Sequence, residues 1–114
     1  MFRNRFLLAL AAVVLTSHAA MAATLRTGTV TYLYVSHESN GFALLRVSGE
    51  QQGTPPPCAT NNQLAFSLDV ASGYAYLSVI QNALAQNRAI IIEGTDTCTI
   101  SGTRESLKSI QIVQ

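Results

Sequence analysis

Residues 63–93, QLAFSLDVASGYAYLSVIQNALAQNRAIIIE, contain the change of hydrophobic period that decides the fold. In residues 63–69, large apolar side chains alternate with smaller ones, which predicts a β-strand with Leu64, Phe66 and Leu68 on one face. In residues 72–87 the apolar side chains recur at steps of three and four, which predicts an amphipathic helix. Residues 88–93 are β-branched and almost wholly apolar, which predicts a buried strand.

The predicted helix has one apolar face and a recognisable signal at each end. Ser72 is a residue type that caps helix N-termini, and Asn87 is one that ends helices in a left-handed conformation. We expect the residues that recur at helical spacing to meet the core: Leu77, Ile80 and Leu84, flanked by Tyr76 and Ala83.

Two more strands are predicted upstream of this stretch. Residues 27–36 (TGTVTYLYVS) are rich in Thr, Val and Tyr, which favour strands, and residues 42–48 (FALLRVS) are similarly apolar. Between them, residues 37–41 end in Asn-Gly, a strong signal for a tight turn. We therefore expect a hairpin over residues 27–48.

The remaining segments predict a long loop and the C-terminal strands. Residues 49–62 are polar and contain three consecutive prolines, which is typical of a loop. After a turn at residues 94–96, residues 98–103 are expected to form a short strand. Residues 107–113 alternate again, with Ile110 and Ile112 on one face of a last strand.

The predicted order is therefore β-β-β-α-β-β, mainly β with one helix between the third and fourth strands. This is the order of an OB-fold, a five-stranded Greek-key barrel, and we expect that fold. A β-grasp domain, which has one strand fewer before its helix, and an irregular sandwich remain as alternatives.

Residues 1–22 have the pattern of a cleaved signal peptide. Arg3 and Arg5 supply a positive start, and an unbroken apolar run follows at residues 6–15. This run is half of the ~20 apolar residues that a membrane-spanning helix needs, and no later stretch is long enough, so we expect no membrane span.

The small residues Ala20 and Ala22 stand where signal peptidase requires them, three residues and one residue before the cut. We expect cleavage after Ala22 or Ala23, and a single OB-like domain over residues 24–114. The mature protein is then expected to be periplasmic or secreted.

Removal of the signal changes the charge of the protein. The net charge of the chain falls from +1 to −1, because five basic residues then face six acidic ones. The basic surface typical of nucleic-acid binders is absent, so we expect no nucleic-acid partner. A near-neutral chain rich in Ser, Thr, Asn and Gln suits neutral, hydroxyl-rich ligands or protein partners.

The only two cysteines, Cys58 and Cys98, both lie in the mature part. In an exported chain such a pair is expected to form a disulfide. The alternatives are redox chemistry or metal binding, but there is no C-x-x-C, and His37 is the only histidine that could join them.

No catalytic set is visible in the mature sequence. His37 is expected in a solvated turn, and no serine lies in a G-x-S-x-G motif. Glu93 and Asp96 are near each other but flank a turn after a buried strand. We therefore predict a protein that is not an enzyme and has no catalytic residue, metal ligand or cofactor, with a hydrolase using Glu93 or Asp96 as the alternative.

The tyrosines are the best candidates for ligand contacts. Tyr combines a flat apolar ring with a hydroxyl group, which suits both sugars and protein surfaces. In a regular strand Val30, Tyr32 and Tyr34 face one side, and Leu33 and Val35 face the other. Tyr32 and Tyr34 are therefore predicted ligand-binding residues, with core packing as the competing interpretation.

Short motifs in order along the mature chain carry a family resemblance. They are Gly28-Thr29-Val30, a Cys after the second strand (Cys58), the helix sequence SVIQNALAQN, the strand IIIEG, and Thr97-Cys98. With these motifs the chain resembles a group of small secreted bacterial proteins of unassigned role. More distantly it resembles the OB-fold B subunits of AB5 toxins, the subtilase-cytotoxin type most of all.

The resemblance implies a function and an assembly. In those toxin subunits five copies form a ring, and each binds a sialylated glycan through a shallow site beside the first strand. In the subtilase-cytotoxin type a Ser just before the strand-one Gly contacts the sugar. That position is Thr27 here, which keeps the hydroxyl group. The chain departs from the toxin subunits in having fewer cysteines and no Trp.

We therefore expect an exported, non-enzymatic binding module for a glycan, with Thr27 as a further binding residue and a homo-oligomer, a pentamer by resemblance, as its assembly. The alternative is a periplasmic protein-interaction or inhibitor protein.

Overall fold

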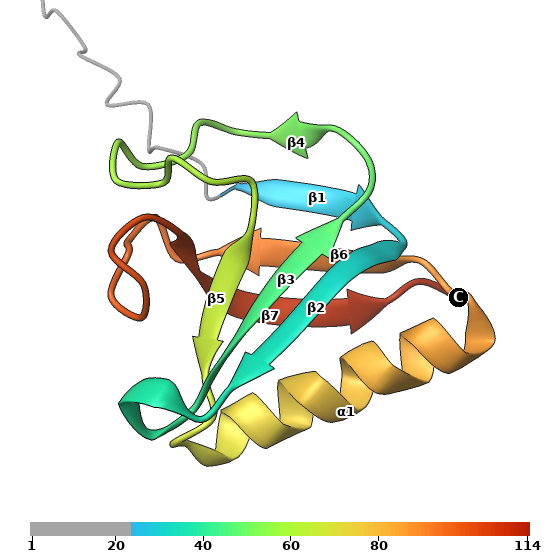
Figure 1. The fold of residues 1–114 in the computed structure, drawn as a ribbon. Coiled ribbons are helices and arrows are strands. Elements are labelled where there is room, and N and C mark those ends of the chain that lie inside the picture. Colours follow the sequence, from blue (N-terminus) through green and yellow to red (C-terminus); the bar gives the residue numbers. More distant parts are fainter. Residues whose placement is uncertain (1–23) are drawn as a thin grey trace, which may run out of the picture.

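The computed structural model describes residues 24–114, and the predicted signal peptide, with its cleavage points after Ala22 and Ala23, lies outside these residues. Figure 1 shows the described chain as short strands with one long helix. The elements follow in this order: β1 (Leu25–Gly28), β2 (Val30–Ser36), the 3₁₀ turn η1 (Glu38–Asn40), β3 (Phe42–Val47), β4 (Gln51–Gln52), β5 (Leu64–Ser67), α1 (Ala71–Gln86), β6 (Ile90–Gly94) and β7 (Glu105–Ile112). The prediction of a mainly β protein with one helix is confirmed.

All seven strands belong to one sheet, in the order β2-β3-β5-β7-β6-β1-β4. Neighbours are antiparallel except β5 and β7, which pair in parallel. Within residues 24–114 the end strands β2 and β4 do not pair with each other, so the sheet is not closed. In Figure 1, β2, β3 and β5 run obliquely across β1, β6 and β7, and α1 lies below them.

The first predicted strand is divided into β1 and β2 by Thr29. At Gly28 a side chain would overlap the backbone carbonyl of Ser48, so only glycine allows the two backbones to approach so closely. A β-bulge then shifts the register between Val30 and Tyr32. An extra residue in a strand reverses which face the following side chains occupy.

The bulge makes the predicted face of Val30 wrong. Val30 and Leu33 both pack against the core, although they were expected on opposite sides. Tyr32 and Tyr34 share a face as predicted: they pair with Arg46 and Leu44, are 36% and 43% exposed, and lie outside the core cluster.

The helix α1 starts two residues earlier than predicted. The helix begins at Ala71 after an extended Val70 that makes no side-chain cap, so the prediction of Ser72 as N-cap is wrong. Gly73 explains the difference, because its backbone lies against the carbonyl of Ser67 at the end of β5, and a side chain there would overlap this oxygen. The helix therefore starts after a short link of residues 68–70, and Ser72 is already inside its first turn.

The end of α1 is as predicted, but one side of its apolar face is not. Asn87 takes the left-handed conformation (φ 49°) and its N–H reaches the carbonyls of the last turn, which confirms it as the stop. Ile80 and Ala83 are buried, and Leu77 packs partly against the core. Leu84 is 47% exposed, because the buried stripe is centred on Ile80 and Ala83, and Leu84 lies on the last turn beside it.

The core lies between α1 and the inner faces of the strands. Its buried members come from β3, β5, α1, β6 and β7: Ala43, Leu45, Val47, Phe66, Ile80, Ala83, Ile90, Ile92 and Leu107. Ile110 and Ile112 pack partly against it, on the one face predicted for them. No helix in residues 24–114 is long and apolar enough to cross a membrane.

The segment between β6 and β7 does not form the predicted strand. Residues 98–103 make only an isolated bridge, between Ser101 and Arg104. Their amides bond locally instead: the N–H groups of Thr99 and Ile100 donate to the Oγ of Ser106, at 3.1 and 3.4 Å. A hydroxyl that accepts hydrogen bonds from these amides competes with strand pairing.

The predicted disulfide between Cys58 and Cys98 is formed.

Candidate binding site

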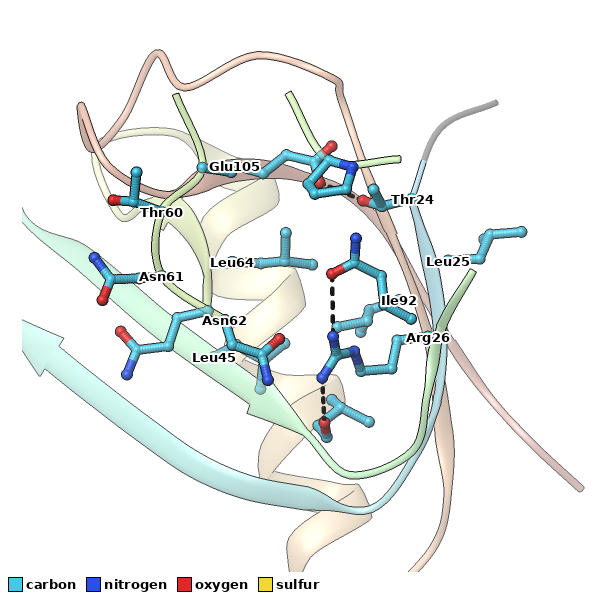
Figure 2. Close-up of a pocket in the computed structure, with 15 residues that line it drawn as sticks. Thr24, Leu25, Arg26, Leu45, Thr60, Asn61, Asn62, Leu64, Ile92 and Glu105 are labelled. Atoms are coloured by element: carbon cyan, nitrogen blue, oxygen red, sulfur yellow. Dashed lines mark hydrogen bonds between the residues drawn. The ribbon is translucent and has the colours of Figure 1, made fainter. Parts of the chain in front are cut away.

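A cavity of about 240 Å³ opens beside β1, at the end of the molecule that carries the proline-rich loop. Figure 2 shows its wall of polar side chains on one side, Arg26 on the other, and apolar side chains between them. Four of the apolar lining residues are core members or pack against the core: Leu45, Val47, Leu64 and Ile92. Leu45, Val47 and Ile92 are buried and Leu64 is partly exposed, so the cavity lies over the edge of the core.

The polar wall is residues 59–63, which directly follow Cys58 in the chain. It presents three successive amide side chains, Asn61, Asn62 and Gln63. An amide group both donates and accepts hydrogen bonds, so this wall can match hydroxyl groups in either role.

This wall is held in place by the segment before β7. The Cys58–Cys98 disulfide joins the two. The N–H of Thr60 donates to the carbonyl of Thr103 at 3.0 Å, and the Nε of Arg104 donates to Gln63 at 2.7 Å. The disulfide therefore positions one side of the cavity as well as linking two loops.

Arg26 forms the opposite side. Its guanidinium donates to the Val47 carbonyl at 3.5 Å and to the side chain of Gln51 at 3.1 Å. Partial burial, and secondarily the positive charge of Arg46, lower the pKa of Arg26 from its usual value. Arginine nevertheless keeps its charge at neutral pH. The cavity therefore contains a cation whose guanidinium has more N–H donors than the two bonds to Val47 and Gln51 use.

Glu105 closes one end of the cavity and is only 3% exposed. One carboxylate oxygen accepts a short hydrogen bond from the hydroxyl of Thr24, and the other accepts the Asp96 N–H at 2.9 Å. Gly94 allows this arrangement, because a side chain at that position would overlap the carboxylate. Glu105 makes no ion pair in residues 24–114, where Lys108 and Glu93 form the one pair present, at 3.4 Å.

The predicted ligand residues lie elsewhere. Tyr32 and Tyr34 are on β2, with the Arg46 guanidinium 5.3 Å from the Tyr32 ring centre and Phe42 6.1 Å from the Tyr34 ring centre. This group, Tyr32, Tyr34, Phe42 and Arg46, is called the aromatic face below. Thr27 is exposed on β1, across the division at Thr29, and neither it nor the tyrosines line the cavity.

The residues considered for catalysis are also separate from one another. His37 lies with Val35 and Tyr74 at a shallow hollow beside the start of α1. Glu93 pairs with Lys108 and accepts a bond from Ser109 at 3.1 Å. Across residues 24–114 no group of three or more His, Cys, Asp or Glu side chains is placed to hold a metal ion.

Sequence reasoning missed every residue that gives the cavity its polarity. Arg26 and Glu105 were read only as members of the overall charge, and residues 59–63 as part of a loop. The run Asn61-Asn62-Gln63, which begins three residues after a cysteine expected in a disulfide, was the one available signal, because a fixed amide-rich loop is a suitable ligand wall.

Taken together, the cavity offers an apolar surface, a row of amides, one guanidinium and one carboxylate, groups that can bind a polar ligand. Comparison of the chain with protein-family models, curated proteins and solved structures gave no match in any of the three. We therefore interpret the cavity from the chemistry of its own residues.

Proposed function

We propose that this protein is an exported, non-enzymatic binding module whose cavity at β1 takes a sugar-sized, hydroxyl-rich ligand. The observation that carries the proposal is the cavity itself, in which three successive amides and a guanidinium surround apolar side chains. Its volume of about 240 Å³ lies just below the range of roughly 300–1,000 Å³ found for small-molecule sites, so a single sugar ring suits it better than a larger compound.

The chemistry of a sugar ring corresponds to that of the lining. A ring has an apolar C–H face, which can rest on the partly exposed Leu64, and hydroxyl edges, which can bond to Asn61 and Asn62. Arg26 adds a donor that suits the carboxylate of an acidic sugar, since a guanidinium can bind a carboxylate through two parallel bonds. An acidic glycan is also what the resemblance to AB5 toxin B subunits implies.

A glycan array probed with the purified processed protein tests the proposal. We expect retention of a defined sugar, and an absence of binding to any sugar at high micromolar protein concentration contradicts it. Titration followed by NMR should then shift the signals of residues 59–63 rather than those of α1.

Matched variants locate the site. Replacing both Asn61 and Asn62 with Ala should weaken binding by roughly tenfold or more, the effect of losing ~1.4 kcal/mol of hydrogen bonding. Asn82→Ala is the control, because Asn82 is exposed on α1 and donates to the Ser78 carbonyl one turn away. Arg26→Gln should weaken binding of acidic sugars more than of neutral ones.

We also propose that the sheet is a partly open OB-type barrel. The support is that β1 and β2 are separated by Thr29 alone, although they occupy distant places in the strand order. The backbone at Thr29 therefore connects β1 to β2, two strands that are not joined by a ladder of hydrogen bonds. By the same resemblance we propose a homo-oligomer, and the mass of the native protein from light scattering tests it.

The aromatic face favours a second candidate, a protein-interaction or inhibitor role in the periplasm. Tyr and Arg are the residue types enriched at the centres of protein interfaces, and here Arg46 already lies over the Tyr32 ring. Pull-down from envelope extracts with the Tyr32→Ala and Tyr34→Ala double variant separates the two functions. Loss of a partner with sugar binding intact supports this second role, and the reverse result removes it.

A further inference from the structure

Glu105 is a buried carboxylate whose charge has no cationic partner in residues 24–114. Both of its oxygens accept hydrogen bonds, from the Thr24 hydroxyl and the Asp96 N–H, but neither donor carries a charge. Arg26, the cation of the same cavity, bonds to Val47 and Gln51 instead. A buried charge is costly unless a counter-charge lies beside it.

Thr24, the donor to Glu105, is also the first residue of the mature protein when cleavage follows Ala23, one of the two expected positions. It is itself buried, and its carbonyl accepts the Gly94 N–H at 2.9 Å, so both its side chain and its backbone are fixed against β6 and β7. The nitrogen of a threonine is three bonds from its Oγ. The Thr24 nitrogen is therefore close to the carboxylate that its hydroxyl contacts.

We propose that removal of the signal peptide creates the missing partner: cleavage after Ala23 leaves a new α-ammonium group on Thr24, which forms an ion pair with Glu105. Water adds across the peptide bond that follows Ala23. The released signal keeps a carboxylate, and the nitrogen of Thr24 becomes an ammonium group.

With this ion pair, the free energy of unfolding depends on whether the signal peptide has been removed. Before cleavage the nitrogen is a neutral amide, and Glu105 has only its two hydrogen bonds. After cleavage a positive charge stands at the buried carboxylate. The inference depends on the signal peptide predicted from the sequence and is independent of what the cavity binds.

The first test is the exported full-length chain. Produced in a bacterial host that secretes it, the protein should begin at Thr24, as read by intact mass and N-terminal sequencing. A product that keeps its first residues, or one that begins anywhere else, overturns the proposal.

The second test removes the charge of the new terminus without changing the chain. Lys108 is the only lysine, so in a Lys108→Arg variant the α-amine is the one amine that reagents can modify. Acetylation removes its charge, whereas reductive dimethylation adds bulk and keeps the charge. We expect acetylation to lower the Tm by roughly 4–8 °C and dimethylation to leave it nearly unchanged. Equal Tm values for the two products refute the ion pair.

A carboxylate variant then identifies the partner. In Glu105→Gln the acetylation effect should vanish, while in Glu93→Gln, which removes a carboxylate of the neighbouring strand, it should persist. An unchanged effect in Glu105→Gln overturns the assignment. If Glu105→Gln does not accumulate as folded protein, the comparison of acetylated with dimethylated protein decides the question by itself.

Discussion

Replacing both Cys58 and Cys98 with Ser should lower the free energy of unfolding by about 4 kcal/mol. The disulfide closes a loop of 40 residues, and in the chain-entropy model a loop of that length restricts the unfolded chain by about this amount. A domain of about 90 residues has a total stability of roughly 5–14 kcal/mol. The disulfide therefore accounts for a large share of the stability of this one.

Urea unfolding followed by circular dichroism measures the effect. With a slope of ~1–2 kcal/mol per molar urea, the midpoint should fall by roughly 2–4 M. Wild-type protein unfolded with a reductant present is the matched comparison, because it loses the same cross-link without substitution. A loss below ~1 kcal/mol in both samples would refute the reasoning, since the unfolded chain would then gain little freedom from losing the bond.

The structure also predicts which part of the domain loses stability first when the disulfide is absent. The amides of Thr60 and Asn61 donate to the Thr103 carbonyl across the linked segments. Without the disulfide their hydrogen exchange should quicken before that of β6 and β7, and any ligand of the cavity should bind more weakly. Exchange that quickens uniformly over the domain would show that the cross-link stabilises the whole fold without positioning the cavity wall.

Three further substitutions test the packing. Gly94→Ala should lower the free energy of unfolding by ~1–3 kcal/mol, because the new methyl group would overlap a buried carboxylate. Gly102→Ala has open space around it and should change this free energy by no more than ~0.5 kcal/mol, and urea unfolding compares the two variants. Ile80→Ala should lower the free energy of unfolding by ~2–5 kcal/mol, because it leaves a cavity in the core. Leu84→Ala, at an exposed position, should lose well under half of that, and similar losses for the two variants would contradict the observed helix face. Tyr76→Phe should cost ~0.5–1.5 kcal/mol through loss of the 2.6 Å bond to a β7 carbonyl, and unchanged thermal unfolding would show that this bond adds nothing.

The secondary structure was predictable wherever one hydrophobic period ran unbroken. Alternation in residues 63–69 and the three- and four-residue steps through Ile80 correspond to β5 and α1. Two of the errors arose where backbone packing overrode a local signal. A bulge reversed the faces of β2 after Val30, and the contact of Gly73 with Ser67 moved the helix start ahead of Ser72.

The cavity was beyond the reach of the sequence for a different reason. Its polar residues come from segments far apart in the chain, with Arg26 on β1, residues 59–63 in a loop and Glu105 at the start of β7. Each of them alone is typical of a solvated surface. Only the pairing of β1 with β6, and of β5 with β7, brings them around one apolar surface.

The place of β7 in the sheet has a consequence for the timing of assembly. β7 is the last strand along the described chain, yet it lies in the middle of the strand order, between β5 and β6. Until it is present, the hairpin side and the β6 side are two fragments with open edges and a half-covered core. A chain threaded through a membrane from its N-terminus would stay incomplete, and so easy to thread, until its final residues arrived.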